Sequence, residues 1–270
     1  MIIRHLQQAI AMKGAVRLDK YTDFASVYDI MMAHIPYDEW ADHIENRLKK
    51  HGIDKGLVLE LGCGTGNMTR RMAARGYDMI GVDISEDMLS LARQRGESED
   101  DDILYLCQDM REFELYGTVA AVFCVCDSIN YMLTQEDLGK VFRLVCNYLD
   151  SGGLFVFDMD TRYLYEEVLG DSVDFINHEA GSILWENTFY PEEIINEVNL
   201  TIFHHQGDNL YRKHQETHVR RAYEVDTIRR LLDEAGLDMT GAYHELTDKE
   251  PEPDSERIYI SANKRISPYA

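Results

Sequence analysis

The sequence predicts an α/β protein built on a doubly wound, mostly parallel sheet, with an antiparallel β segment inserted after the fifth strand. Three observations lead to this fold class. Up to about Asp160, short apolar runs alternate with segments of helical periodicity. A glycine-rich turn, LGCGTGN at 61–67, joins the first apolar run to a helical segment. From about 162 to 219 the segments are longer, alternate apolar with polar residues and are separated by turn signals.

The N-terminal part of the chain predicts helices that precede the sheet. Residues 1–20 hold no apolar run long enough for a signal peptide or a membrane span, so we expect an extension there. From Tyr21 to His51, apolar residues recur at helical spacing, and Pro36 separates two helices.

Five apolar segments have the length and composition of buried strands. We expect these strands at 57–61, 78–83, 103–109, 119–127 and 153–160. The helices between them are expected at 67–75, 85–95 and 134–149. Ser85 is a plausible N-cap of the second helix, and the continuous apolar run VAAVFCVCD suits a strand that is buried on both faces.

The segment after Asp160 predicts an antiparallel insertion. We expect its strands at 182–190, 195–205 and 210–223, with turns at YPEE and QGDN. A helix at 224–236 and two final strands near 242–246 and 257–262 then bring the main sheet to seven strands. The expected domains are an extension at 1–20, a cofactor-binding domain at 21–161 and 220–270, and an inserted antiparallel β lid for substrate at 162–219.

Composition limits the partners that we expect. The formal charge of −22 makes nucleic acid an improbable partner, because the chain would repel phosphate groups and offers only short basic pairs. Five cysteines, mostly in or beside apolar runs, indicate reduced thiols and a cytoplasmic protein. We therefore expect no membrane partner. The chain could form a homodimer.

The glycine turn predicts a nucleotide-like ligand. Gly62, Gly64 and Gly66 allow a sharp bend and a close approach of ligand to backbone. Asp83 ends the second predicted strand, 21 residues after Gly62, where an acid can accept hydrogen bonds from both ribose hydroxyls. The pair indicates a cofactor that contains adenosine.

Two cofactor classes fit these features. The dinucleotide pattern G-x-G-x-x-G is not met, because the third glycine comes one residue early and position 67 is Asn. Glu60, just before the turn, would face a pyrophosphate poorly but would suit the α-amino group of S-adenosylmethionine. Asp109, which ends the third strand, could hold the adenine amino group. An NAD-dependent oxidoreductase stays an alternative.

Four motifs carry a resemblance to a known family. VLELGCGTGN, IGVDISEDMLSLAR, CQDMREFEL and VCDSINYM resemble, in order and spacing, the motifs of class I S-adenosylmethionine-dependent methyltransferases. The chain looks most like small bacterial members, a group that includes the N,N-dimethyltransferases of nucleotide-linked amino sugars. The resemblance covers about Tyr21 to Lys264 and implies a Rossmann-like methyltransferase sheet with a lid.

The resemblance also implies the residues that bind the cofactor. They come from the N-terminal helix and from the ends of the first four strands: Tyr21, Tyr28, Glu60, Gly62, Cys63, Gly64, Asp83, Ile84, Met88, Asp109, Met110 and Cys126. The glycines and the backbone near Cys63 would pack on the methionine part, with Glu60 at its amino end. Asp83 would hold the ribose, while Ile84, Met88, Asp109 and Met110 would surround the adenine.

Methyl transfer from a sulfonium needs alignment, a dry site and a base for the acceptor's proton. The candidate catalytic residues are Asp127, Tyr131 and His218. Asp127 could equally cap a loop, and Tyr131 could serve only in packing. His214 and His218 are four apart on a predicted strand, about 13 Å, too far to share an ion, so we expect no metal.

The sequence therefore predicts a methyltransferase that uses S-adenosylmethionine and acts on a small-molecule acceptor. Nitrogen is preferred over oxygen as the acceptor atom, by resemblance to the amino-sugar enzymes. The motif CDS departs from several of those enzymes, which have small or serine-like residues there. Beside the NAD-dependent alternative, a non-catalytic regulatory module that retains the cofactor site stays open.

Overall fold

The structure is a computed structural model that describes residues 35–99, 102–178 and 181–266. The strands of its central sheet are β1 (Leu57–Leu61), β2 (Asp78–Asp83), β3 (Leu104–Cys107), β4 (Val119–Cys124), β5 (Leu149–Asp160), β10 (Leu237–His244) and β11 (Arg257–Lys264). Their spatial order is β10-β11-β5-β4-β1-β2-β3. Neighbouring strands are parallel, except that β11 is antiparallel to both β5 and β10. The predicted seven-stranded, mostly parallel sheet is confirmed.

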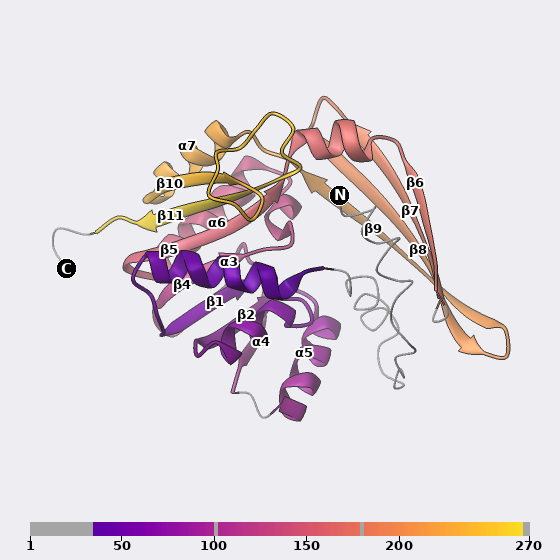
Figure 1. Ribbon diagram of the computed structural model, residues 1–270, viewed down its shortest axis with the longest axis horizontal. Coiled ribbons are helices and arrows are strands. Elements are labelled where there is room, and N and C mark those ends of the chain that lie inside the picture. The colour runs from indigo at the N-terminus through magenta and orange to yellow at the C-terminus, as the bar shows by residue number, and fades with distance from the viewer. Residues whose placement is uncertain (1–34, 100–101, 179–180, 267–270) are drawn as a thin grey trace.

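Helices cover both faces of this sheet (Figure 1). They are α3 (Tyr37–Lys50), α4 (Asn67–Ala74), α5 (Glu86–Glu99), α6 (Gln135–Tyr148) and α7 (Val225–Ala235), with short turns η3 (Ser128–Tyr131) and η4 (Leu164–Leu169). Buried residues of α3 and α4 pack on one face, and those of α6 and α7 on the other. The layers make the fold doubly wound.

Local sequence accounts for several helix ends. The Thr134 hydroxyl accepts a hydrogen bond from the backbone N–H of Asp137 at 3.1 Å and so caps α6. Ser85 caps α5 as expected, since its hydroxyl accepts from the N–H of Met88 at 3.3 Å. Gly236 ends α7 in the left-handed conformation that favours glycine.

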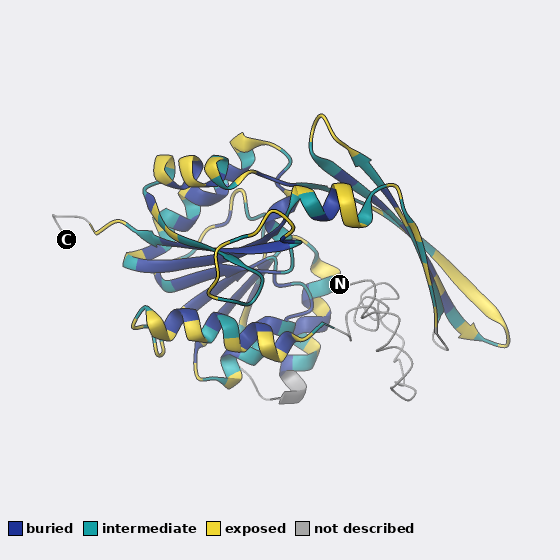
Figure 2. Ribbon diagram, turned by 45° about the horizontal axis from the view of Figure 1, so that its top comes forward, coloured by how far each residue is buried: buried dark blue, intermediate teal, exposed yellow. Residues whose placement is uncertain are grey.

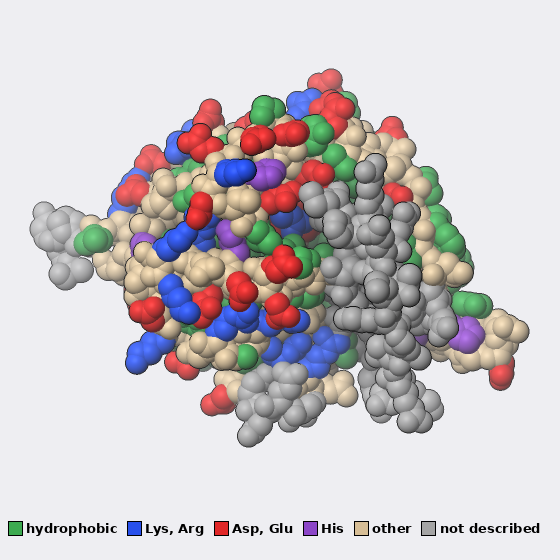
Figure 3. All heavy atoms as spheres, in the orientation of Figure 1, with side chains coloured by type: hydrophobic (Ala, Val, Ile, Leu, Met, Phe, Trp, Pro, Cys, Tyr) green, Lys and Arg blue, Asp and Glu red, His purple; other side chains and the backbone are tan. Residues whose placement is uncertain are grey.

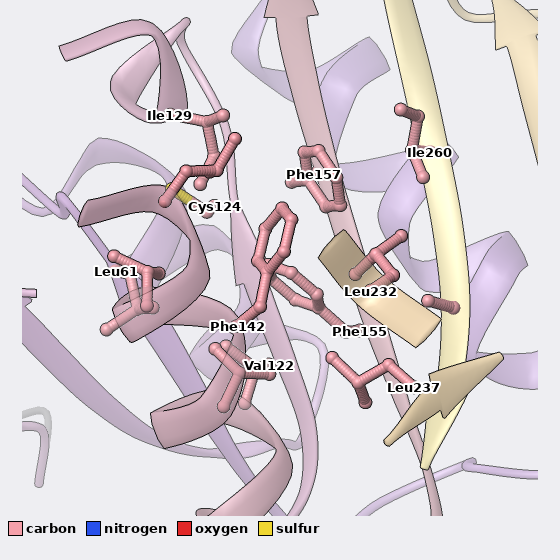
Figure 4. Packing of buried hydrophobic residues seen from close by; sticks show 14 of the residues in the cluster. Leu61, Val122, Cys124, Ile129, Phe142, Phe155, Phe157, Leu232, Leu237 and Ile260 are labelled. Carbon is pink, nitrogen blue, oxygen red and sulfur yellow. The ribbon is translucent and has the colours of Figure 1, made fainter. Parts of the chain in front are cut away.

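The core between the sheet and α6 is aromatic. Phe142 of α6 lies over Phe155 and Phe157 of β5, with ring centroids 5.9 and 5.5 Å away. Figure 4 shows these rings beside Val122 and Leu232, which come from β4 and α7. Figure 2 shows the central strands buried along most of their length, as the apolar run of β4 predicts.

A second sheet follows β5 in the sequence. Its four antiparallel strands, in spatial order, are β6 (Val173–His178), β7 (Gly181–Tyr190), β8 (Ile195–Gly207) and β9 (Leu210–Arg221). Figure 1 shows this sheet beside the central layers rather than stacked on them. Asp208 and Asn209 both have positive φ at the β8–β9 turn, which fits the turn expected from QGDN. The inserted antiparallel sheet is therefore confirmed, and β6 is a strand that the sequence did not predict.

Several strand ends differ from the predictions. β3 and β4 stop earlier than expected, at Cys107 and Cys124. β4 stops because the two residues at 126 and 127 turn into left-handed backbone. β5 starts at Leu149 and β10 at Leu237, both earlier than expected. Leu149 pairs with Val119 before an irregularity in the register, and Leu237 pairs with Lys264. The first predicted N-terminal helix, with Tyr21 and Tyr28, lies outside the described residues.

The surface carries mixed charge over the helices. On the face in Figure 3, acidic and basic side chains are interspersed. Arg71 of α4 and Arg75, just after α4, for example, pair with Asp38 and Asp42 of α3 at 2.8 and 2.6 Å. Within the described ranges, every helix is too short or too polar to cross a bilayer.

Candidate active site

One large cavity lies between the two sheets. Residues after β1, β2, β3 and β4 form one side of it, and β6 to β9 form the other. Its volume is about 730 Å³, within the range of small-molecule sites. The strand order reverses between β1 and β4, and ligands of doubly wound sheets bind at such a point.

The glycine turn exposes its backbone to this cavity. Gly62 has φ of 71°, and a Cβ there would lie 2.6 Å from the Ser128 hydroxyl, so a side chain is excluded. Gly64 also has positive φ, at 53°, but no atom lies within 4 Å of its missing Cβ. The space beside Gly64 is therefore open to a ligand.

Asp83 ties the end of β2 to that turn. One carboxylate oxygen accepts from the backbone N–H of Gly64 at 2.7 Å and the other from Ser85 at 2.8 Å. Burial raises the pKa of Asp83. Next to it Ile84 is 68% exposed and lines the cavity with Met88 and Met110. An apolar wall beside a strand-end acid suits an adenosine.

Glu60 is the most deeply buried acid at the cofactor end. Its carboxylate accepts a hydrogen bond from the Thr69 hydroxyl. Burial raises the pKa of Glu60 to about 8. A buried acid of this kind gains most from a cationic ligand group, because a positive charge restores its ionised form.

Two other predicted cofactor residues have partners within the protein. Asp109 binds the Arg111 guanidinium at 2.5 Å, and this contact lowers the pKa of Asp109. The thiol of Cys63 packs with Leu89 and Tyr105. Cys63 also lines the cavity, as part of the glycine turn.

The turn after β4 is strained and strongly held. Cys126 and Asp127 have φ of 61° and 53°, conformations that cost energy for residues other than glycine. Their backbone N–H groups donate to the carboxylate of Asp158, at 3.2 and 2.9 Å. Asp158 in turn binds Arg257 at 2.8 Å. This arrangement fixes the direction in which Asp127 points.

Asp127 belongs to an ionic cluster, which is formed by the three acids Asp127, Asp158 and Asp160 and the two arginines Arg220 and Arg257. The Asp127 carboxylate binds Arg220 at 2.5 Å and Arg257 at 3.0 Å, and both arginines also bind Asp160. Burial and then the charge of Asp127 raise the pKa of Asp160. The sequence did not lead us to predict Asp158, Asp160, Arg220 or Arg257 as site residues. The motif DMD at 158–160, with an acid at each end, closes a buried strand and was the one pattern that pointed to two of them.

Tyr131 and His218, predicted separately, are in contact. The Tyr131 hydroxyl lies 2.9 Å from Nδ1 of His218, and Nε2 of His218 lies 3.3 Å from the Glu216 carboxylate. All three side chains line the cavity. His214 and His218 do lie on a strand, β9, as expected.

Aromatic residues near the N-terminal edge also line the cavity. Tyr37 and Trp40 of α3 are both more than nine-tenths buried, so each combines core packing with a place at the site. The Arg257 guanidinium lies 5.2 Å from the Trp40 ring centre. Tyr21 and Tyr28 lie outside the described residues.

One row of side chains crosses the inner face of the second sheet. Asp174 pairs in register with Trp185, Trp185 with Leu200, and Leu200 with Glu216. All four residues line the cavity. The row has an acid on each edge strand and apolar groups between them.

The residues at the strand ends fit S-adenosylmethionine. The open backbone at Gly64 leaves room for the methionine part, and buried Glu60 matches its ammonium group. Exposed Ile84 beside Asp83 matches the adenosine. A dinucleotide would instead set its pyrophosphate against Glu60, whose carboxyl group offers no positive charge to pair with it.

Comparisons with known proteins agree with this fit. A model of the methyltransferase domain matches residues 58–153. YqeM of Bacillus subtilis, which is named as a methyltransferase, is 36% identical over 245 residues, covering 90% of this chain and 97% of YqeM. A Streptomyces venezuelae protein named as a dTDP-3-amino-3,4,6-trideoxy-alpha-D-glucopyranose N,N-dimethyltransferase is 30% identical over 138 residues, 50% of this chain and 56% of its own length.

A solved structure shows the same arrangement over nearly the whole chain. The crystal structure of an S-adenosylmethionine-dependent methyltransferase from Clostridium acetobutylicum matches with a TM-score of 0.82 and 28% identity, covering 90% of this chain and 98% of that one. The predicted cofactor is confirmed, and the NAD-dependent alternative is set aside. The chain belongs to the S-adenosylmethionine-dependent methyltransferases.

Proposed function

We propose that this methyltransferase modifies a small molecule, with an amine nitrogen preferred over oxygen as acceptor. The row Asp174–Trp185–Leu200–Glu216 carries the proposal. Three strand spacings of about 4.8 Å separate its two acids, so their backbones lie about 14 Å apart. An amine that binds as its ammonium ion gains from either acid and from the face of Trp185, while an apolar body covers Leu200.

The ionic cluster supports an uncharged or cationic acceptor over an anionic one. Arg220 and Arg257 line the cavity, but their guanidinium groups already bind Asp127, Asp158 and Asp160. An acceptor phosphate would have to compete with these buried carboxylates for the arginines. We therefore favour a simple amine over a nucleotide-linked amino sugar.

The cofactor end is proposed to work as follows. S-adenosylmethionine supplies an activated methyl group when it is bound. Glu60 binds the ammonium, Asp83 the ribose, and Asp109 the adenine amino group. Ile84, Met88 and Met110 contact the adenine, and Gly62, Cys63, Gly64 and Cys126 contact the methionine part through their backbone. Tyr21 and Tyr28 complete the set on resemblance alone.

The proposed division of labour gives residues 162–219 the role of an acceptor-binding lid on a cofactor-binding domain at 21–161 and 220–270. The cavity supports this division, since its acceptor end is lined by β6 to β9. We also propose a cytoplasmic location, because all five cysteines, each inside the described ranges, are free thiols.

A matched pair of acceptors tests the proposed function. The protein is incubated with tritiated S-adenosylmethionine and either phenethylamine or phenethyl alcohol, with a dTDP-amino sugar as a third acceptor. We expect label in the amine, and Asp174→Asn to raise its KM about tenfold. Glu186→Gln removes the same charge from an exposed neighbour of Trp185 outside the cavity and should leave KM unchanged. Label only in the alcohol or the amino sugar would contradict the proposal.

A further inference from the structure

We propose that Tyr131, His218 and Glu216 form a proton relay that removes the acceptor's proton during methyl transfer. Tyr131 touches the acceptor, His218 takes the proton, and Glu216 is a positioning residue that orients His218. The relay rests on the proposed function, because it needs an acceptor that loses a proton in this cavity.

Distances and orientation support each link of the relay. The Tyr131 oxygen lies 2.9 Å from His218 Nδ1, and the two rings meet edge-on with centroids 6.0 Å apart. His218 Nε2 lies 3.3 Å from Glu216. Glu216 and His218 are two residues apart on β9, so their side chains share one face of the strand.

These contacts select one tautomer of His218. The Glu216 carboxylate lies 3.3 Å from Nε2, and its negative charge favours the tautomer that carries the ring proton on that nitrogen. Nδ1 is then the free acceptor, and it receives the Tyr131 O–H. The three groups thus share one direction of proton transfer, from the cavity through Tyr131 to His218.

The groups around Tyr131 favour a phenol that passes a proton on over one that stays ionised as a phenolate. Desolvation of the hydroxyl in the cavity, followed by the nearby charge of Asp127, raises the pKa of Tyr131, although the residue as a whole is 43% exposed. The phenol therefore keeps its proton at neutral pH. Asp160, Arg220 and Glu216 are the other charged groups that face it. Asp127 is bound by both arginines, so it is a poor competitor for the acceptor's proton.

The relay joins the two parts of the protein. Tyr131 lies in η3, after β4, while His218 and Glu216 lie on β9 of the second sheet. It is therefore complete only when β9 lies against η3, as it does here. Proton removal would depend on the position of the lid.

The proposed step balances as follows. The bound ammonium first passes one proton to the Tyr131 oxygen as the Tyr131 proton passes to His218 Nδ1, and this frees the nitrogen lone pair. The nitrogen then forms a bond to the methyl carbon, the carbon–sulfur bond breaks, and sulfur keeps the electron pair. The positive charge of the sulfonium ends on the methylated ammonium product, and that of the bound ammonium ends on the imidazolium, next to the Glu216 carboxylate.

The first test measures the tautomer of His218 and needs no acceptor. Nitrogen NMR of the histidine rings, with S-adenosylhomocysteine bound, should show His218 protonated at Nε2. Tyr131→Phe and Glu216→Ala should each add the Nδ1–H form. An Nδ1–H ring in the unmodified protein would overturn the relay. Because S-adenosylhomocysteine affinity is measured in the same samples, loss of cofactor binding is recognised separately.

The second test measures kcat with phenethylamine. Tyr131→Phe should lower kcat about 100-fold, the lower range for a general base. Glu216→Gln should lower kcat about tenfold in the wild-type background but have little further effect in Tyr131→Phe, because the relay is already broken there. An equal loss in both backgrounds would mean a structural role and overturn the relay. Glu186→Gln serves as the charge-matched control. Absence of label with wild-type protein would contradict the proposed function and leave the tautomer result to judge the relay.

Discussion

The buried carboxylate of Asp158 on β5 accepts a hydrogen bond of 2.9 Å from the backbone N–H of Asp127. Its other oxygen accepts from Cys126 and binds Arg257. One acid therefore holds a strained turn and neutralises a buried arginine at the same time. The turn aims Asp127 at the acceptor end of the cavity.

We expect Asp158→Ala to destabilise the protein by about 3–5 kcal/mol, because it removes the acceptor of the Cys126 and Asp127 N–H groups and of one Arg257 nitrogen, although Arg257 keeps Asp127 and Asp160. Urea unfolding measures this loss. Asp238→Ala is the control, since it breaks an exposed pair with Arg265 and should leave the free energy of unfolding nearly unchanged. Equal losses in the two variants would refute the role of Asp158.

Glu60 should make the free protein less stable as the pH rises. Its pKa is about 8 in the folded protein, above the ordinary value of 4.5. Its stabilising contribution is complete below pH 4.5 and is lost as pH rises through 8. Glu60→Gln has no such loss, so its free energy of unfolding at pH 7 should exceed that of the wild type by roughly 3 kcal/mol. Thermal unfolding at pH 5 and 7 checks this, and a pH-independent difference would contradict it.

Cofactor binding should release a proton through the same residue. At pH 7 the free protein holds Glu60 mainly protonated, and the ammonium of S-adenosylhomocysteine should ionise it. Calorimetry in buffers of different ionisation enthalpy should detect release of about one proton. Glu60→Gln should bind more weakly and release none, whereas release that persists in this variant would assign the proton to another group.

Gly64 offers a test of where the ligand approaches. Gly64→Ala and Gly76→Ala both place a side chain at positive φ, 53° and 93°, with no atom within 4 Å. Each should cost about 1–2 kcal/mol of stability. Only Gly64→Ala should weaken S-adenosylhomocysteine binding, by tenfold or more, because only Gly64 lines the cavity. Similar affinities for the two variants would place the ligand elsewhere.

Asp83→Ala should lower the affinity for S-adenosylhomocysteine about 100-fold, since hydrogen bonds to a charged group contribute about 1.5–3 kcal/mol each. The same change frees the N–H of Gly64, so its effect on folding must be measured alongside. Asp87→Ala, at a neighbouring position on the cavity wall, is the comparison. Unchanged affinity in Asp83→Ala would remove it from the ribose role.

Local patterns were enough to predict the central sheet. β1, β2 and β4 are apolar runs, and Asp83 could be placed at a strand end because the run before it is continuous. β6 was missed because VDFINH lacks strong alternation, and its strand form depends on pairing with β7.

The ionic cluster and the relay could not be predicted from sequence patterns. Asp127 and Arg257 are 130 positions apart, and Tyr131 and His218 are 87 apart. Their contacts arise only after β11 pairs with β5 and β9 reaches η3. Sequence reasoning identified Tyr131 and His218 as single candidates, but not that they meet.

The most direct test of the central claim is transfer of a tritiated methyl group from S-adenosylmethionine to phenethylamine, followed by separation of the labelled product. We predict labelled N-methylphenethylamine with the wild-type protein, little with Asp83→Ala, and more label in the amine than in phenethyl alcohol. Binding of S-adenosylhomocysteine without label in any small molecule would contradict the account.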